Sequence, residues 1–309
     1  MKIFKNKKGG QNAYMEKTDL INFNNAKEIP PEYNGSEKKK TMILNGKKYL
    51  VKFPDSNRSS KLNISYINNV YSEYIGSKIF NLLGVKTQNV ELGYYDQDKR
   101  RFYVCACEDF TTENTKLIEF EKLENASIDS EGEKKDLADI KHIIELNTYN
   151  IDKEEFKKFF WDMFIIDCLI GNTDRHNGNF GFIKNIKTEE LTLAPIYDCG
   201  SCLFSTLTDE KMEEILNKEG LLRDCIKNTS SAIKYNGSKI KYYDFITKME
   251  NKDCIEALNR IYPKIEIEKI NNIIDEIPCI SDIRKSFYKK IIKSQYNDIL
   301  KVAYKKRKE

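Results

Sequence analysis

The polar loop that decides the fold of this chain reads Asn172-Thr173-Asp174-Arg175-His176-Asn177-Gly178-Asn179-Phe180-Gly181-Phe182. An apolar run with helical spacing covers residues 156–170 before it and ends at Gly171. Two short runs of strand character follow the loop, and the second ends at Asp198. The pattern therefore places two carboxylates and an amide, those of Asp174, Asp198 and Asn179, at the ends of predicted elements.

These three groups suit phosphoryl transfer. Mg²⁺ on a nucleotide needs hard oxygen ligands, and the acceptor hydroxyl needs a carboxylate that orients and deprotonates it. Asp174 is predicted to be that base, and Asn179 and Asp198 to be the metal ligands. Asn179 follows Asp174 by five residues, the spacing of a kinase catalytic loop, and Asp198 follows Asp174 by 24 residues. Asp, Asn and Gly also collect in ordinary turns, so the loop by itself leaves a purely structural interpretation open.

Two more residues of the loop are charged or titratable. His176 is included in the candidate catalytic set, as a hydrogen-bonding residue that fixes the loop rather than as a proton carrier. Arg175 needs no role beyond that of a solvated charge. Both follow Asp174, whereas in ordinary protein kinases His and Arg precede the catalytic Asp.

Composition narrows the class of protein. The 309 residues include 52 basic and 48 acidic side chains, and a net charge of +4 does not indicate a nucleic-acid partner. No apolar stretch follows the basic start, and residues 159–170 are too few to span a bilayer. We expect a soluble, cytoplasmic, monomeric protein without a membrane partner.

Eight cysteines in a chain of this length are expected to be reduced thiols. Cys199 and Cys202 form a C-x-x-C pair that could be a redox pair or half of a zinc site, completed by Cys105 and Cys107 on one strand face. Small buried side chains are the favoured interpretation.

The N-terminal part predicts strands and a phosphate-binding loop. Residues 1–31 close with two prolines and are interpreted as a loose arm or short edge strand. Asn45-Gly46 between apolar runs predicts a hairpin. Just before it, residues 35–39 provide Gly35, Ser36 and Lys39, which could cover nucleotide phosphates. A solvated lysine cluster in a surface turn is the alternative.

A lysine and a glutamate favour a nucleotide site in the same region. Lys52 is flanked by apolar residues on the second strand of the hairpin, and residues 64–83 repeat apolar side chains at helical spacing. Glu73 lies at the border of that apolar stripe. A strand lysine paired with a helix glutamate is the arrangement that contacts ATP phosphates in kinases. A solvated edge charge and a solvated helix charge remain the alternatives.

A second predicted hairpin, residues 90–107 with its turn at 96–99, leads into a candidate adenine-binding hinge at residues 107–110. Glu108, Asp109 and Phe110 are its candidate residues, acting through backbone N–H and C=O groups. The charged residues 121–138 are interpreted as an exposed insertion.

The remaining chain is predicted to be helical almost throughout, with helices at residues 209–216, 242–249, 254–261, 265–277 and 281–305. The predicted fold class is α+β: a two-lobed, protein-kinase-like fold with an antiparallel-sheet small lobe at residues 32–110 and a mostly helical large lobe at 111–309.

With these elements in place, the sequence resembles the HipA-like serine/threonine kinases, and within them the short branch typified by CtkA. The resemblance covers roughly residues 20–305. It is carried by Tyr33-x-Gly35-Ser36-x-x-Lys39, Tyr49-Leu50-Val51-Lys52-Phe53-Pro54, Glu73, Asn172-Thr173-Asp174-Arg175-His176-Asn177-Gly178-Asn179 and Ala194-Pro195-Ile196-Tyr197-Asp198-Cys199-Gly200.

The resemblance implies transfer of the ATP γ-phosphate to serine or threonine of a protein substrate, with autophosphorylation. It implies Asp174 as base, Asn179 and Asp198 as Mg²⁺ ligands, and Lys52 on the α- and β-phosphates. About 32 residues precede the phosphate loop, so the additional N-terminal region that ties HipA toxins to their operon partners is not expected. Glu32, Tyr33 and Asn34 stand ahead of Gly35, so the serine whose autophosphorylation inactivates those kinases is not expected either. A nucleotide-binding pseudokinase or regulatory module, and a lipid or small-molecule kinase, remain alternatives.

Overall fold

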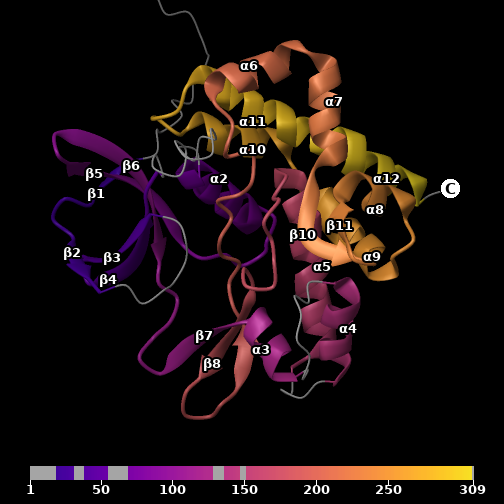
Figure 1. Ribbon diagram of the computed structural model, residues 1–309, viewed down its shortest axis with the longest axis horizontal. Helices are drawn as coiled ribbons and strands as arrows, with labels where there is room; N and C mark the ends of the chain where they lie inside the picture. Colours follow the sequence, from indigo (N-terminus) through magenta and orange to yellow (C-terminus); the bar gives the residue numbers. More distant parts are fainter. Residues whose placement is uncertain (1–18, 31–37, 55–68, 128–135, 147–150, 308–309) are drawn as a thin grey trace, which may run out of the picture.

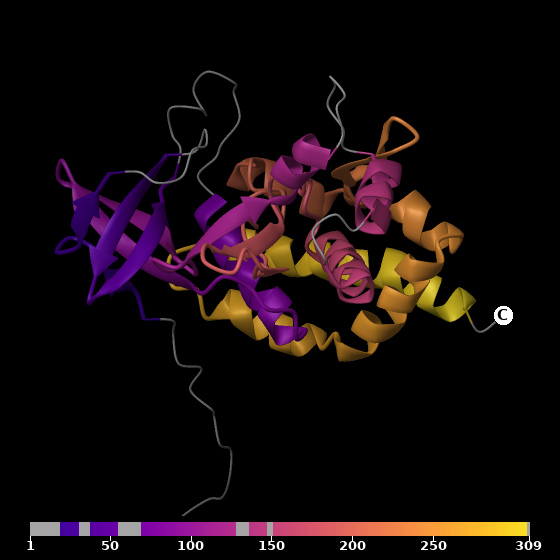
Figure 2. The same cartoon turned by 90° about the horizontal axis from the view of Figure 1, so that it is seen from below.

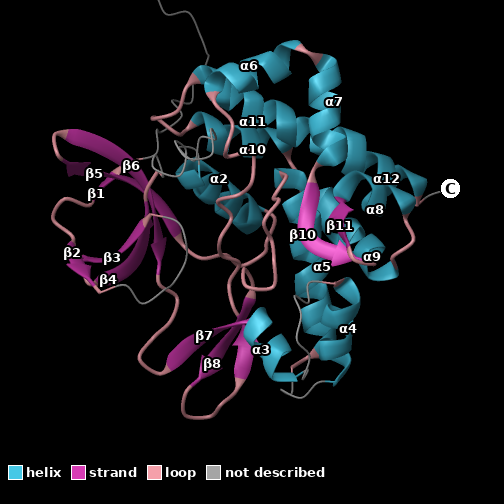
Figure 3. Ribbon diagram, in the orientation of Figure 1, coloured by secondary structure: helices cyan, strands magenta, loops and turns pink. Residues whose placement is uncertain are grey.

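The computed structural model describes residues 19–30, 38–54, 69–127, 136–146 and 151–307. Figures 1 and 2 show two lobes, with a β-sheet at one end and helices gathered at the other. Figure 3 shows that strands dominate the small lobe and helices the large lobe, which confirms the predicted α+β class. Among the described residues, no helix is long and apolar enough to cross a membrane.

The small lobe is built on one six-stranded sheet with the order β1-β5-β6-β4-β3-β2. Its strands are β1 (Ile21–Asn22), β2 (Lys27–Ile29), β3 (Lys39–Leu44), β4 (Lys47–Lys52), β5 (Val90–Gln97) and β6 (Arg100–Glu108). All pairs are antiparallel except β1 with β5. The two strands at residues 21–29 form the edges of the sheet, so the small lobe begins before the predicted boundary at residue 32.

Both predicted hairpins of the small lobe are confirmed. Asn45 and Gly46 connect β3 and β4 with φ angles of 51° and 78°. Asp98 and Lys99 connect β5 and β6 with φ angles of 52° and 61°. Two consecutive positive φ angles give a turn whose twist matches that of the flanking strands, which is why such short loops close these hairpins.

The two faces of the sheet carry separate apolar clusters because side chains alternate along a strand. In β6, Val104 and Ala106 belong to an outer cluster with Phe23 and Phe53. Cys105 and Cys107 point the other way, toward the cluster that contains α2 (Asn69–Leu82) and the apolar residues of the large lobe. Helix α2 therefore joins the sheet to the large lobe. Residues 64–68 of the predicted helix lie outside the described part of the chain.

The connection between the lobes differs from the predicted exposed insertion. Strand β7 (Thr115–Glu119) pairs with β8 (Gly181–Asn185), which pairs with β9 (Leu191–Leu193). Helix α3 (Phe120–Ser127) buries Phe120 and Leu123, and α4 (Leu137–Leu146) buries Leu137. For the described residues of this range the expectation was wrong, because a few apolar side chains among many charges are enough to anchor two short amphipathic helices. Residues 128–135 of the predicted insertion lie outside the described part of the chain.

Helix α5 (Lys153–Ile170) leads into the polar loop, as predicted. Asp152 caps its first turn by accepting from the backbone N–H groups of Glu154 and Glu155. Gly171 ends it in the left-handed region at φ 62°. Since a residue with a Cβ is disfavoured there, this glycine sets the point at which the chain leaves the helix.

The C-terminal part contains the predicted helices and two elements that were not predicted. The helical elements are α6 (Asp209–Asn217), α7 (Glu219–Asn228), α8 (Tyr242–Lys248), α9 (Lys252–Ile261), η1 (Tyr262–Lys264), α10 (Ile267–Asp275), α11 (Asp282–Gln295), the π-turn η2 (Tyr296–Leu300) and α12 (Lys301–Lys306). Helix α7 and the hairpin of β10 (Ser230–Tyr235) and β11 (Ser238–Lys241) are the additions. Asn236-Gly237, with φ angles of 52° and 77°, is the turn signal that could have revealed the hairpin.

Candidate active site

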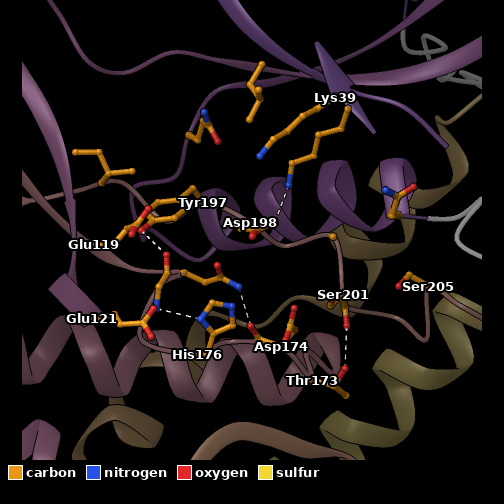
Figure 4. Close-up of a pocket in the computed structure, with 18 of the residues that line it drawn as sticks. Lys39, Glu119, Glu121, Thr173, Asp174, His176, Tyr197, Asp198, Ser201 and Ser205 are labelled. Atoms are coloured by element: carbon orange, nitrogen blue, oxygen red, sulfur yellow. Dashed lines mark hydrogen bonds and ion pairs between the residues drawn. The ribbon is translucent and has the colours of Figure 1, made fainter. Parts of the chain in front are cut away.

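A cavity of about 720 Å³ is lined by residues of both lobes. The small lobe contributes Lys39, Leu50, Lys52 and Gln88, and the large lobe contributes the polar loop and the segment around Asp198. Figure 4 shows Lys39 on one side of this cavity, Asp174 and His176 facing it, and Asp198 between them. Side chains that are far apart in the sequence are thus brought to one place.

The ammonium group of Lys52 lies between two carboxylates. Its Nζ is 2.7 Å from Glu73 Oε2 and 2.6 Å from Asp198 Oδ1. Lys52 is the last residue of β4 and Glu73 is one turn into α2, so the sheet, the helix and the segment after β9 meet at this ammonium. The second oxygen of Glu73, Oε1, accepts from the backbone N–H of Cys199 at 3.0 Å. The glutamate therefore fixes both the lysine and the residue next to Asp198.

The pKa values of these two carboxyl groups are shifted in opposite directions. Complete burial raises the pKa of Glu73, although the charge of Lys52 opposes this shift. Burial also acts to raise the pKa of Asp198, but attraction to Lys52 and the hydrogen bond from its ammonium outweigh it and leave that pKa below its usual value. The side chain of Asp198 is partly buried at the cavity, and the residue has a positive φ of 58°. An ionised carboxylate held in a sparsely populated conformation is typical of a functional position.

Lys39 places a second cation beside Lys52. The two residues lie opposite each other in the β3–β4 register, and both line the cavity. Two lysines at one cavity wall provide the charge that a polyphosphate requires. Gly35 and Ser36, the other residues predicted to cover the phosphates, lie outside the described residues.

The polar loop presents Asp174 and Asn179 to the cavity. Asp174 is exposed, and its backbone carbonyl accepts from Asn179 Nδ2 at 2.8 Å. Because the amide nitrogen is used inside the loop, the amide oxygen of Asn179 is the atom left to act as a metal ligand. The backbone N–H of Asp174 donates to Asn172 Oδ1 at 3.1 Å, and Asn172 in turn donates to Asp167 at 2.8 Å. The loop is held by its own side chains.

Arg175 is not a solvated charge, contrary to the expectation from the sequence. It is 1% exposed, and its Nε lies 2.9 Å from Asp167 Oδ2. Its Nη1 donates to the backbone carbonyls of Asn179 at 2.7 Å and Tyr197 at 2.6 Å. Burial acts to lower the pKa of Arg175, but the charge of Asp167 raises it well above its usual value. The guanidinium joins the end of α5, the loop and the residue before Asp198.

His176 has the structural position that was predicted for it, and it also lines the cavity. Its Nδ1 accepts from the backbone N–H of Gly178 at 3.0 Å. The hydroxyl of Tyr197 donates to the carbonyl of Gly178 at 3.1 Å. A Cβ at Gly178 would lie 2.9 Å from the histidine ring and 3.1 Å from Glu121 Oε2, so the loop packs closely at this point. Glu121 and Tyr197 were not singled out from the sequence.

The hinge differs in part from the prediction. Asp109 and Phe110 line the cavity, and the ring of Phe110 lies 6.0 Å from that of Tyr197. Glu108 does not line it: its backbone N–H donates to Asn89 and its carbonyl accepts from Gln88 Nε2. The backbone N–H of Asp109 donates to Lys48. Both backbone groups of Glu108 thus have partners within the protein, so adenine contacts are not expected from Glu108.

The donor set fits one Mg²⁺ bound together with a nucleotide. Among the described residues, no group of three or more His, Cys, Asp or Glu could hold a metal ion by itself. Mg²⁺ in nucleotide sites is commonly held by one or two protein oxygens, and phosphates and water complete its shell. The carboxylate of Asp198 and the amide oxygen of Asn179 are of that kind.

The cysteines have structural positions. None of the eight, all within the described ranges, forms a disulfide. Cys199 and Cys202 are fully buried, and burial raises the pKa of the Cys199 thiol to about 12. A thiol in this state is protonated and unreactive at neutral pH. The buried, apolar interpretation of the C-x-x-C pair therefore agrees with the structure.

A two-lobed fold with a paired lysine, a catalytic-type loop and an acidic residue after a hairpin is that of a protein-kinase-like phosphotransferase. The family model described as the HipA-like C-terminal domain matches residues 32–277. The chain therefore belongs to the HipA-like family, and it is a serine/threonine protein kinase of the CtkA type.

Two matches to proteins named CtkA support this assignment. The serine/threonine-protein kinase CtkA of Helicobacter pylori (strain J99) is 41% identical over 268 residues, which are 85% of this chain and 81% of that protein. The crystal structure of a Helicobacter pylori proinflammatory kinase CtkA matches with a TM-score of 0.83 and 36% identity, over 93% of this chain and 98% of that chain. A Shewanella oneidensis MR-1 HipA, HipB and operator DNA complex matches with a TM-score of only 0.46 and 14% identity, over 91% of this chain and 70% of that chain.

Proposed function

We propose that the chain transfers the γ-phosphate of Mg-ATP to serine or threonine hydroxyls of a protein substrate and to itself. The observation that carries this proposal is the position of the Lys52 ammonium, bound to Glu73 and Asp198, at a cavity that Asp174 also lines. A kinase aligns ATP by a lysine that is held by such a glutamate, and it acts mainly by positioning and charge neutralisation.

In this proposal the two lysines of the small lobe hold the phosphates. Lys52 and Lys39 neutralise negative charge on the triphosphate, and Glu73 keeps Lys52 directed at the cavity. Asn179 and Asp198 would hold the Mg²⁺, which neutralises phosphate charge when it is bound. Asp109 and Phe110 line the cavity where the hinge passes, the place for the adenine.

Asp174 orients the acceptor and takes its proton. As the acceptor oxygen forms a bond to the γ-phosphorus, the bond from that phosphorus to the bridging oxygen of ADP breaks, and ADP leaves with the electron pair. The hydroxyl proton passes to the carboxylate of Asp174, which is exposed and therefore within reach of a substrate side chain. The hydrogen bond from Asn179 Nδ2 to the Asp174 carbonyl holds the base and the metal ligand in a fixed position relative to each other.

The test separates chemistry from binding. We expect Asp174→Asn to lower kcat by roughly 10²- to 10⁴-fold with little change in ATP affinity. Asp198→Asn should weaken Mg²⁺-dependent ATP binding as well as transfer. Asp224→Asn, at an exposed position of α7, is the matched control and should leave both unchanged.

Phosphate transfer is measured with labelled ATP, a peptide and protein panel and a lipid panel, and phosphosites are identified by mass spectrometry. Wild-type activity in Asp174→Asn would overturn the role of the base. Transfer only to lipids or small molecules would overturn the substrate class, and ATP binding without any transfer would indicate a pseudokinase.

A further inference from the structure

Asn69 is a buried amide at the cavity with no partner among the described residues. It is 2% exposed, and neither its Nδ2 nor its Oδ1 has a hydrogen bond. The same residue lines the cavity that contains Lys52 and Asp198. A buried amide without a partner destabilises a protein, so a partner is expected in the functional state.

The position of Asn69 on α2 indicates what that partner is. Asn69 is the first described residue of α2 and lies four residues before Glu73, so the two share one face of the helix. That face approaches the segment after Asp198: Glu73 accepts from the Cys199 N–H, and a Cβ at Gly76 would lie 2.8 Å from Cys199 Cβ. Asn69 extends this face by one turn beyond the Lys52–Glu73 pair.

Two features of this end of α2 suit an anion. Asn69 lies toward the N-terminal end of the described helix, where the helix dipole places partial positive charge. The first turn contains no acidic residue. A neutral amide that can donate a hydrogen bond adds to this field, whereas an aspartate at the same place would oppose it.

We propose that the side-chain amide of Asn69, at the start of the described part of α2, donates a hydrogen bond to a phosphate oxygen of the bound nucleotide. This inference rests on the proposed function, because it requires a nucleoside polyphosphate in the cavity. The phosphate group is the required ligand, so ATP and ADP are bound through Asn69 and adenosine is not. Asn69 is then a binding residue that anchors the phosphates from the helix while Lys52 and Lys39 bind them from the sheet.

The test is a pair of variants with two readouts. In Asn69→Leu the amide is replaced by an apolar side chain of similar size, and removal of an unpartnered polar group should leave the melting temperature without nucleotide unchanged or raise it. The same variant should bind Mg-ATP about tenfold to a hundredfold more weakly, the effect of one hydrogen bond to a charged group, and adenosine with unchanged affinity. Asn69→Asp should weaken Mg-ATP binding at least as much.

The matched controls are Asn81→Leu and Asn81→Asp, on the exposed side of the same helix, and both should leave all affinities unchanged. Loss for ATP alone would place the contact at the γ-phosphate, and loss for ATP and ADP would place it at the β-phosphate. Equal affinity of wild type and Asn69→Leu for Mg-ATP, or an equal loss for adenosine, would overturn the inference. Absence of ATP binding by the wild-type protein would instead overturn the proposed function.

Discussion

The guanidinium of Arg175 and the carboxylate of Asp167 form an ion pair from which solvent is excluded, with 2.9 Å between Nε and Oδ2 and 3.2 Å between Nη2 and Oδ1. The side chain of Arg175 is 1% exposed and that of Asp167 is 0% exposed. Since Arg175 also binds two backbone carbonyls, this pair carries the geometry of helix α5 into the loop that contains Asp174.

We expect Arg175→Met to destabilise the protein by about 3–5 kcal/mol, because it leaves the carboxylate of Asp167 buried without its partner. The free energy of unfolding is measured by urea denaturation. Arg223→Met, which removes an exposed ion pair with Glu219 at 3.4 Å, is the matched control and should cost less than about 1 kcal/mol. Similar losses for the two variants would contradict the structural role assigned to Arg175.

The lysine and glutamate of the small lobe should act as one unit. Lys52→Met is expected to lower kcat/KM by roughly 10²- to 10³-fold, because it removes preorganised positive charge from the phosphates. Glu73→Gln should lower it less, and the double variant should be no worse than Lys52→Met, since residues that act together are not additive. Steady-state kinetics of the wild type, the two single variants and the double variant measures this coupling. Lys47 is on the same strand and pairs with Glu108 at the surface, so Lys47→Met should have the kcat/KM of the wild type. Strictly additive effects of Lys52→Met and Glu73→Gln would refute the coupling.

Activity should be lost in acid before the fold is lost. The pKa of Glu73 is raised above its ordinary value of 4.5, so as the pH falls this carboxyl takes up its proton before an ordinary glutamate does. Protonation breaks its ion pair with Lys52. Because the folded state binds that proton more tightly than the unfolded state, protonation of Glu73 does not itself favour unfolding. Asp198 has a lowered pKa, so the stability it contributes is present above its usual value of 3.8 and is lost as pH falls below that value.

A pH series of transfer rates, with circular dichroism on the same samples, checks this order. The wild-type rate should fall with a midpoint above pH 4.5 while the folded signal persists. Glu73→Gln should lack this acid limb. An acid limb of the same shape in wild type and Glu73→Gln would assign the titration to another group.

Close packing between α2 and the segment after Asp198 should make Gly76 intolerant of a side chain. A Cβ at Gly76 would lie 2.8 Å from Cys199 Cβ and 3.2 Å from Cys202 Sγ. We expect Gly76→Ala to destabilise the protein by about 1–3 kcal/mol and to lower activity, because overpacking displaces the segment that contains Asp198. Gly220→Ala, in helix α7 with open space around it, should instead stabilise by about 0.5–1 kcal/mol. Thermal melts and kinetic assays of both variants test this difference, and wild-type behaviour of Gly76→Ala would disprove it.

Much of the fold follows from local patterns. The turns at Asn45-Gly46 and Asp98-Lys99, the cap at Asp152 and the stop at Gly171 are each decided by a few adjacent residues, so they could be predicted without coordinates. The hairpin at Asn236-Gly237 carried the same signal, but it lies among helical patterns and was missed.

The sequence by itself determined the family and the candidate residues for its chemistry, because the residue types at Asp174, Asn179 and Asp198 and their spacing are those expected for phosphoryl transfer. Only the tertiary structure decided which charges are buried and what they contact. Arg175 and Asp167 look like ordinary polar residues until α5 and the loop enclose them, and Asn69 gains significance only when α2 brings its amide to the cavity. Burial and long-range contacts depend on how distant elements pack, and no local pattern of residues contains that information.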